Sequence, residues 1–166
     1  PQGVAVERLR GEDVPGLTRR LPEWYPDIAV GSESPHLDPA YYHAETWLEG
    51  VSPERDILPI LVRHQGGIAG IATLKKDSGA RALTGRLMVL APDLRNLGVG
   101  AEMVRLSEKI ARAMGAGVIH YFATLRHPYS QRIMETCGFV PVGIVPAFDR
   151  AAIRPGIVRR VSEAVK

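Results

Sequence analysis

The pattern of apolar and polar residues divides the first third of the chain into a strand and two helical segments. Residues 4–9 alternate apolar and charged side chains, which predicts a strand. Apolar residues then recur at helical spacing over residues 14–21. Residues 21–38 contain three prolines and predict an irregular connection. Asp38, followed by a proline, is typical of a helix start, and this helix is expected to end at Gly50.

The middle of the chain predicts three strands that run antiparallel, followed by a long amphipathic helix. Residues 57–63 and 68–74 are mainly apolar and flank a glycine-containing turn, which predicts a hairpin. A third strand is expected over residues 83–90. From Gly98 to Met114 the apolar residues fall on one helical face, with charged residues elsewhere.

The last third predicts a strand over residues 118–125, a short helix over residues 130–137 and a final strand over residues 139–148. This order of elements predicts an α+β fold in which helices pack on the faces of a sheet. No composition shift marks a second domain, so we expect one domain over residues 1–150. Residues 151–166 are expected to form a C-terminal tail or linker.

Composition narrows the possible functions only slightly. A chain of 166 residues with one cysteine can bury a core but cannot form an intrachain disulfide, which favours a reducing, cytoplasmic location. No apolar stretch is long enough to cross a membrane. The net charge of +3 is too small to indicate nucleic-acid binding. The first residue is Pro1, which suggests a trimmed chain or a piece of a longer protein.

The turn between the predicted strand over residues 83–90 and the long helix has the pattern of an anion site. The first turn of a helix carries unpaired N–H groups and the positive end of the helix dipole. Gly98 and Gly100 let the backbone approach an anion closely, and Arg95 either contacts a phosphate or holds the loop. The spacing differs from the dinucleotide fingerprint and from the ATP-binding P-loop. The residues of this turn are Arg95, Asn96, Leu97, Gly98, Val99, Gly100 and Ala101.

This turn resembles the hallmark of the GNAT superfamily of acetyl-CoA-dependent N-acetyltransferases. The family pattern is Gln/Arg-x-x-Gly-x-Gly/Ala, after a strand that ends in Val/Leu-x-Pro-Asp/Glu. The residues that match it are Leu90, Pro92, Asp93, Arg95, Gly98 and Gly100.

A second stretch resembles a downstream motif of the same family, Asn-Pro-x-Ala-x-x-Leu-Tyr-Glu-x-x-Gly-Phe. Residues 127–139 have the same length and order. The spacing between the two motifs and the order of elements also fit, so the resemblance extends over about residues 4–150. The residues that match in register are Pro128, Glu135, Gly138 and Phe139.

The resemblance implies a mixed, mostly antiparallel sheet that splays open at the cofactor site, with helices on both faces. In the family, the pantetheine arm of coenzyme A lies in the splay and pairs with backbone there, while the pyrophosphate sits on the turn. These roles transfer to Met88, Val89 and Leu90 for the pantetheine and to residues 95–101 for the pyrophosphate, with His127 and Ser130 as further contacts. The expected donor is acetyl-CoA or a longer acyl-CoA, and no metal site is expected.

The implied reaction is direct attack of an amine on the thioester carbonyl, with a backbone N–H near Leu90 as the oxyanion donor. The family's tyrosine, which protonates the departing thiolate, falls at Met134, and methionine cannot donate a proton. Ser130, Tyr129 and His127 are the nearby substitutes. Ser130 could instead cap its helix, and His127 could instead contact the cofactor or the backbone.

The general base is open. His120 shares a face of its predicted strand with Phe122 and Thr124, so it is either a base that acts through water or a packed histidine. The segment that walls the acceptor site in the family contains acidic residues and a histidine, which we interpret as surface charges. These residues are Glu23, Asp27, Glu33, His43 and Glu45.

Two functional hypotheses follow from the sequence. The first is an N-acyltransferase that moves an acetyl group to an amine of a small molecule or a protein, as a monomer or a homodimer. The second is a non-catalytic acyl-CoA-binding or sensing module of a larger protein, which Met134 would suit. Neither hypothesis involves nucleic acid or a membrane.

Overall fold

The computed structural model describes residues 2–30, 33–48, 54–124 and 128–145 of the chain. Nine helices and strands are assigned within these ranges, together with four short 3₁₀ segments. The helices and strands are β1 (Val4–Arg8), α1 (Val14–Trp24), α2 (Pro39–Glu45), β2 (Ile57–His64), β3 (Gly67–Asp77), β4 (Ala82–Leu90), α3 (Val99–Ala113), β5 (Val118–Tyr121) and α4 (Tyr129–Thr136). The 3₁₀ segments are η1 (Gly11–Asp13), η2 (Pro26–Val30), η3 (Ser34–Leu37) and η4 (Pro92–Leu94).

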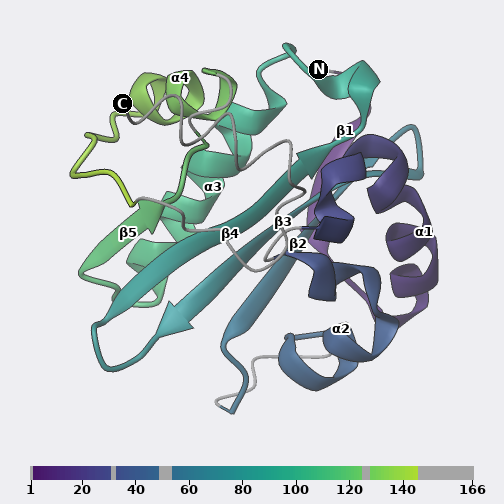
Figure 1. The fold of residues 1–166 in the computed structure, drawn as a ribbon, viewed down its shortest axis with the longest axis horizontal. Coiled ribbons are helices and arrows are strands. Elements are labelled where there is room, and N and C mark those ends of the chain that lie inside the picture. The colour runs from purple at the N-terminus through teal and green to yellow at the C-terminus, as the bar shows by residue number, and fades with distance from the viewer. Residues whose placement is uncertain (1, 31–32, 49–53, 125–127, 146–166) are drawn as a thin grey trace.

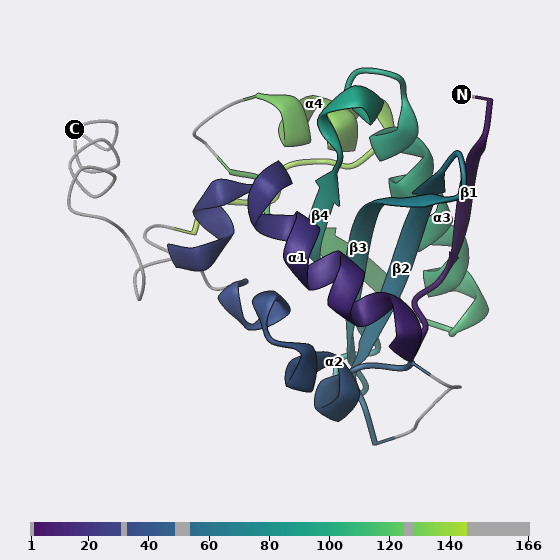
Figure 2. The same cartoon turned by 90° about the vertical axis from the view of Figure 1, so that its right-hand side faces the viewer.

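The strands form one mixed sheet in the order β1-β2-β3-β4-β5. Each pair from β1 to β4 is antiparallel, and β5 runs parallel to β4. Helices α1 and α2 cover one face of this sheet, and α3 covers the other (Figures 1 and 2). This arrangement confirms the predicted mixed, mostly antiparallel sheet with helices on both faces.

The hairpin between β2 and β3 follows the turn chemistry of its sequence. Gln65 and Gly66 are the two loop residues, and both have positive φ values, 51° and 79°. Positive φ at both central positions is the signature of a type I′ turn, whose twist matches that of the flanking strands. The turn therefore closes the β2–β3 hairpin that the sequence predicted.

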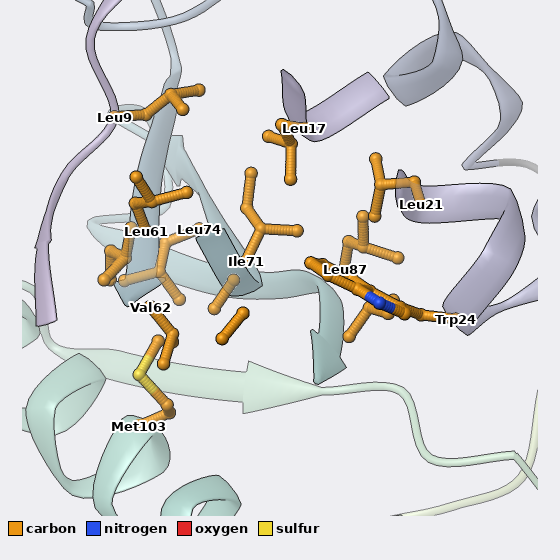
Figure 3. Packing of buried hydrophobic residues seen from close by; sticks show 14 of the residues in the cluster. Leu9, Leu17, Leu21, Trp24, Leu61, Val62, Ile71, Leu74, Leu87 and Met103 are labelled. Atoms are coloured by element: carbon orange, nitrogen blue, oxygen red, sulfur yellow. The ribbon is translucent and has the colours of Figure 1, made fainter. Parts of the chain in front are cut away.

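The hydrophobic core occupies both sides of the sheet. On one side, Leu17 and Leu21 of α1 point toward Ile71 of β3, and all three side chains are fully buried (Figure 3). On the other side, Met103 of α3 lies beside Val62 of β2 (Figure 3). Each such side chain contributes roughly 1.5–3 kcal/mol by leaving water. These contacts fix α1 and α3 against opposite faces of the strands that carry the site.

Helix α2 begins where the sequence predicts and ends earlier. Asp38 Oδ1 accepts a hydrogen bond from the backbone N–H of Ala40 at 2.9 Å, as expected of an N-cap. The predicted end at Gly50 is wrong, because the helix stops at Glu45. Thr46 is already extended and forms an isolated parallel bridge with Ile57 of β2.

The predicted strand over residues 139–148 is wrong in its described part, since residues 139–145 form no strand. Pro141 has no N–H to give to a ladder, and the apolar side chains from Val140 to Val145 are largely exposed. The preceding strand is also shorter than predicted and ends at Tyr121. An open groove of about 410 Å³ therefore lies beside β5, with Phe139 and Val140 on its wall.

The expected boundary at residue 150 and the tail over residues 151–166 lie outside the described residues. None of the helices within the described ranges combines the length and the apolar character needed to cross a bilayer.

Candidate functional site

Strands β4 and β5 separate partway along their length, which leaves one edge of β4 without a partner strand among the described residues. They pair only from Ala82 to Gly85, whereas β4 continues to Leu90. The N–H of Ala91 bonds to the oxygen of Ala69 at 2.8 Å, which fixes the alternation of the β3–β4 ladder. Met88 and Leu90 therefore direct their backbone groups toward the open edge. By the same alternation, Val89 directs its backbone groups to β3.

A β-bulge marks the point at which the two strands separate. Thr73 of β3 lies opposite Leu87, but the next residue, Leu74, lies opposite Gly85. Arg86 is therefore an extra residue in β4, and its side chain joins that of Leu87 on one face. The backbone N–H of Leu87 donates to Thr73 Oγ1 at 3.2 Å. The bulge and the splay thus begin at the same residue.

The turn after β4 presents an open helix N-terminus. Gly98 is the N-cap of α3 with φ of 82°, and a Cβ placed there would meet no atom within 4 Å. The first intrahelical bond runs from the N–H of Glu102 to the oxygen of Gly98 at 3.1 Å. The N–H groups of Val99, Gly100 and Ala101 precede it and have no partner within the helix. Together with the helix dipole, they form a site that can accept an anion.

Gly100 has a different neighbour from Gly98. A Cβ at Gly100 would lie 3.0 Å from Cδ1 of Ile133 in α4. The missing side chain therefore lets α4 pack closely on the start of α3. The sequence suggested only that this glycine admits an anion, and the packing supplies a second physical reason for it.

Arg95 holds the loop, which is one of the two roles expected of it. Its Nη2 donates to the backbone oxygen of Trp24 at 2.6 Å, and its Nε donates to the oxygen of Leu90 at 3.2 Å. Trp24 is the last residue of α1, so its carbonyl has no donor within the helix. The guanidinium thus joins the end of α1, the end of β4 and the anion turn.

Ser130 carries a buried hydroxyl that has no partner among the described residues. Helix α4 has Pro128 as its N-cap and no side-chain cap bond, so the interpretation of Ser130 as a cap is wrong. Ser130 Oγ is buried, and the described residues offer it no hydrogen-bond partner. A buried hydroxyl without a partner is costly, so this atom fits a contact with a bound molecule. His127, the neighbouring candidate, lies outside the described residues.

His120 lies on the face of the sheet that α1 and α2 cover. Its neighbour Tyr121 packs edge-on against Phe139, on the face that carries α3 and α4, and successive strand residues point to opposite faces. His120 Nε2 lies 2.7 Å from Thr84 Oγ1 on β4, and its ring contacts Phe122 edge-on. The predicted base candidate is therefore partly exposed and held at the base of the splay.

A ring of hydrogen bonds next to the bulge involves residues that the sequence did not bring together. Arg86 Nη2 lies 2.8 Å from Glu33 Oε1. His36 Nδ1 contacts the backbone oxygen of Glu33 at 3.1 Å, and His36 Nε2 contacts Thr73 Oγ1 at 3.3 Å. The bond from Leu87 N–H to Thr73 closes the ring, because Leu87 follows Arg86 directly.

The histidine of this ring is neutral because it is buried. Burial lowers the pKa of His36 to about 4, so the imidazole is uncharged at neutral pH. We assign the proton to Nδ1, which donates to Glu33, while Nε2 accepts from the Thr73 hydroxyl. The sequence interpretation of Glu33 as a surface charge is wrong, since its side chain is only 16% exposed. No signal along the chain linked these three segments, which are far apart in sequence.

Cys137 has the environment of a packed residue, as the sequence suggested. Burial raises the pKa of its thiol, and the Sγ lies 3.6 Å from the backbone oxygen of Ala101. A protonated thiol is a poor nucleophile. Within the described ranges, no group of three or more His, Cys, Asp or Glu side chains is arranged to hold a metal ion.

The chain matches the family model described as Acetyltransferase (GNAT) family over residues 19–139. That range contains the splay, the anion turn and α4. Among curated protein sequences, none matches this chain.

Solved structures share the fold at low sequence identity. AAC(6')-Iy in complex with the bisubstrate analog CoA-S-monomethyl-acetylneamine has a TM-score of 0.65 and 13% identity, over 86% of this chain and 94% of that one. PaiA N-acetyltransferase from Thermoplasma acidophilum in complex with coenzyme A has a TM-score of 0.66 and 15% identity, over 88% and 94%. Ribosomal-protein-alanine N-acetyltransferase from Brucella melitensis biovar Abortus 2308 has a TM-score of 0.61 and 14% identity, over 86% and 95%.

Proposed function

This chain belongs to the GNAT family of acetyltransferases, and from that premise we propose that it moves an acetyl group from acetyl-CoA to an amine. The observation that supports this most strongly is the combination of the open β4 edge with the anion turn at its end. An extended amide-bearing arm and a pyrophosphate need those two kinds of backbone group in that order. The solved neighbours bound to coenzyme A or to its bisubstrate analog add to this support.

The binding roles divide between two segments. The N–H groups of residues 99–101 would receive the pyrophosphate, because they lie at a helix N-terminus with open space around Gly98. The outward backbone groups of Met88 and Leu90 would pair with the pantetheine amides. Arg95 would keep the two segments in register through its bonds to Leu90 and Trp24.

The chemistry would be direct transfer. The acceptor nitrogen bonds to the acyl carbon, the carbon–sulfur bond breaks, and the nitrogen loses a proton. His120 is the base that we propose, because it is partly exposed on the acceptor face beside the base of the splay. Ser130 is the proposed donor to the departing sulfur, because its buried hydroxyl lacks a partner among the described residues. Met134 cannot fill that role.

Thiol release from acetyl-CoA, measured against a panel of small amines and peptide N-termini, tests the proposed function. We expect at least one amine to accelerate release, and His120→Gln to lower kcat by about 100-fold or more. Arg112→Gln, on the exposed end of α3, is the matched control and should retain full activity. Calorimetric binding of acetyl-CoA without amine-dependent release would contradict transfer and favour the binding-module hypothesis, which the methionine at 134 also suits.

A further inference from the structure

Arg86 places a positive charge where the acceptor would have to enter. It is the bulged residue of β4, one position beyond the last pairing with β5. Its guanidinium pairs with Glu33, which directly precedes η3 on the face covered by α1 and α2. His120 and Thr84 lie on that same face, two positions before the bulge. The side chain of Arg86 is 30% exposed, so the Glu33 pair does not bury it completely.

The guanidinium is held in one orientation before any ligand arrives. Glu33 Oε1 binds Nη2 at 2.8 Å, and the backbone of Glu33 is itself fixed by the buried His36. His36 is bonded to Thr73, which accepts from the residue next to Arg86. A side chain with five N–H donors in a rigid fork loses little entropy on binding when it is already positioned. The ring therefore prepares Arg86 for recognition of a planar anion.

Arg86 and two carboxylates, Glu33 and Glu45, are the charged groups that act on the neighbouring Tyr41. Burial is the main cause that raises the pKa of this tyrosine to about 12, so it is neutral. Glu33 is already engaged by Arg86, and Glu45 is exposed and screened by solvent. A second cation brought against the guanidinium would be repelled, whereas a carboxylate would be attracted.

We propose that Arg86 binds a carboxylate carried by the acceptor, so that the enzyme prefers amines with an acid group close to the amine, as in amino acids. The inference rests on the proposed transferase function and names the substrate class of that site. Arginine suits this role because two of its N–H groups can bind both oxygens of one carboxylate. Glu33 is then a positioning residue that orients Arg86 and moderates its charge.

Matched acceptors test the proposal directly. The thiol-release rate is measured for a set of amino acids and for the amide of each, which differ only in the negative charge. We expect kcat/KM to favour the acids by roughly 10- to 100-fold. Arg86→Gln should remove that preference by lowering the rates of the acids while leaving those of the amides largely unchanged. Arg86→Lys should retain part of it, because lysine keeps the charge but loses the fork.

A second variant separates recognition from structure. Glu33→Gln keeps an oxygen that can accept from Arg86 but removes the competing charge. We expect a lower KM for the acids and an unchanged KM for the amides. A merely structural ion pair would instead affect both kinds of acceptor equally in Glu33→Gln and in Arg86→Gln, and that result would overturn the proposal.

Binding measurements cover the case in which turnover is absent. Calorimetric titration of the same acids and amides into protein saturated with coenzyme A reports recognition without chemistry. The carboxylate site is supported, even if transfer fails, when the wild type binds the acids but not the amides and Arg86→Gln no longer binds the acids. Equal binding of both, or binding of neither, overturns it. Turnover of amides as fast as acids would overturn the carboxylate site and leave the transferase function intact.

Discussion

Arg95 Nη2 lies 2.6 Å from the backbone oxygen of Trp24, and this bond attaches the anion turn to the last residue of α1. The carbonyls at a helix C-terminus lack donors within the helix, and here a guanidinium supplies one. The same side chain donates to the oxygen of Leu90 at 3.2 Å. Helix α1 and the anion turn are therefore joined by one residue.

Replacing Arg95 with alanine should destabilise the protein. The variant loses two hydrogen bonds to carbonyls, and because the side chain is largely exposed we expect a loss of about 1–2 kcal/mol in the free energy of unfolding. Urea unfolding measures it. Arg105→Ala, which removes only an exposed pair with Glu102, is the control and should stay within about 0.5 kcal/mol of wild type. Equal effects of the two substitutions would contradict the role of Arg95.

Gly85 should not tolerate a side chain while Tyr121 is present. A Cβ at Gly85 would overlap the Tyr121 ring, which is held in place by an edge-on contact with Phe139. We expect Gly85→Ala to cost about 1–3 kcal/mol of unfolding free energy. In a Tyr121→Ala background, the same substitution should cost much less.

A double-mutant cycle by thermal unfolding checks this coupling between Gly85 and Tyr121. Additive effects would show that the aromatic ring of Tyr121 does not prevent a side chain at position 85. That result would contradict the packing at the base of the splay.

The sequence predicted most of the scaffold because local signals determine it. The apolar runs of β2, β3 and β4, the two-residue turn at Gln65 and the glycines of the anion turn each act within a few residues. The last predicted strand failed because an apolar run indicates burial or pairing only when a partner strand is present. Residues 139–145 have no such partner among the described strands.

The ring around the bulge could not be predicted for a different reason. A bulge leaves no trace in a period-two pattern, since Arg86 and Leu87 look like any adjacent strand residues. Glu33 and His36 reach it from a proline-rich segment that carries no periodicity. Their roles depend on three-dimensional contacts between segments that are tens of residues apart.

Stability should fall as the pH drops from about 6.5 toward 4, because of His36. Its pKa is lowered from 6.5 to about 4 in the folded protein, mainly by burial. As the pH falls, His36 is protonated in the unfolded chain before it is protonated in the folded protein. The stabilisation that comes from the lowered pKa of His36 is therefore complete above pH 6.5 and is lost as the pH falls toward 4. The loss amounts to at most about 3 kcal/mol, measured by urea unfolding at a series of pH values.

The variant His36→Gln isolates that contribution. Glutamine offers one donor and one acceptor but does not titrate, so its unfolding free energy should change less between pH 6.5 and 4 than that of the wild type. Carboxylates elsewhere titrate in both proteins, so their effect cancels when the unfolding free energy of the variant is subtracted from that of the wild type at each pH. Identical pH profiles would show that His36 is not held neutral by the fold.

Calorimetric titration of acetyl-CoA into the wild type and into Leu97→Glu and Leu97→Gln tests the anion turn most directly. Leu97 is 54% exposed just before the N-cap of α3, so both substitutions spare the core and differ only in charge. We expect one site per chain in the wild type, a similar affinity in Leu97→Gln, and a loss of roughly tenfold or more in Leu97→Glu, through repulsion of the pyrophosphate. Absence of binding by the wild type, or equal affinities of the two variants, would contradict binding of the pyrophosphate at residues 95–101.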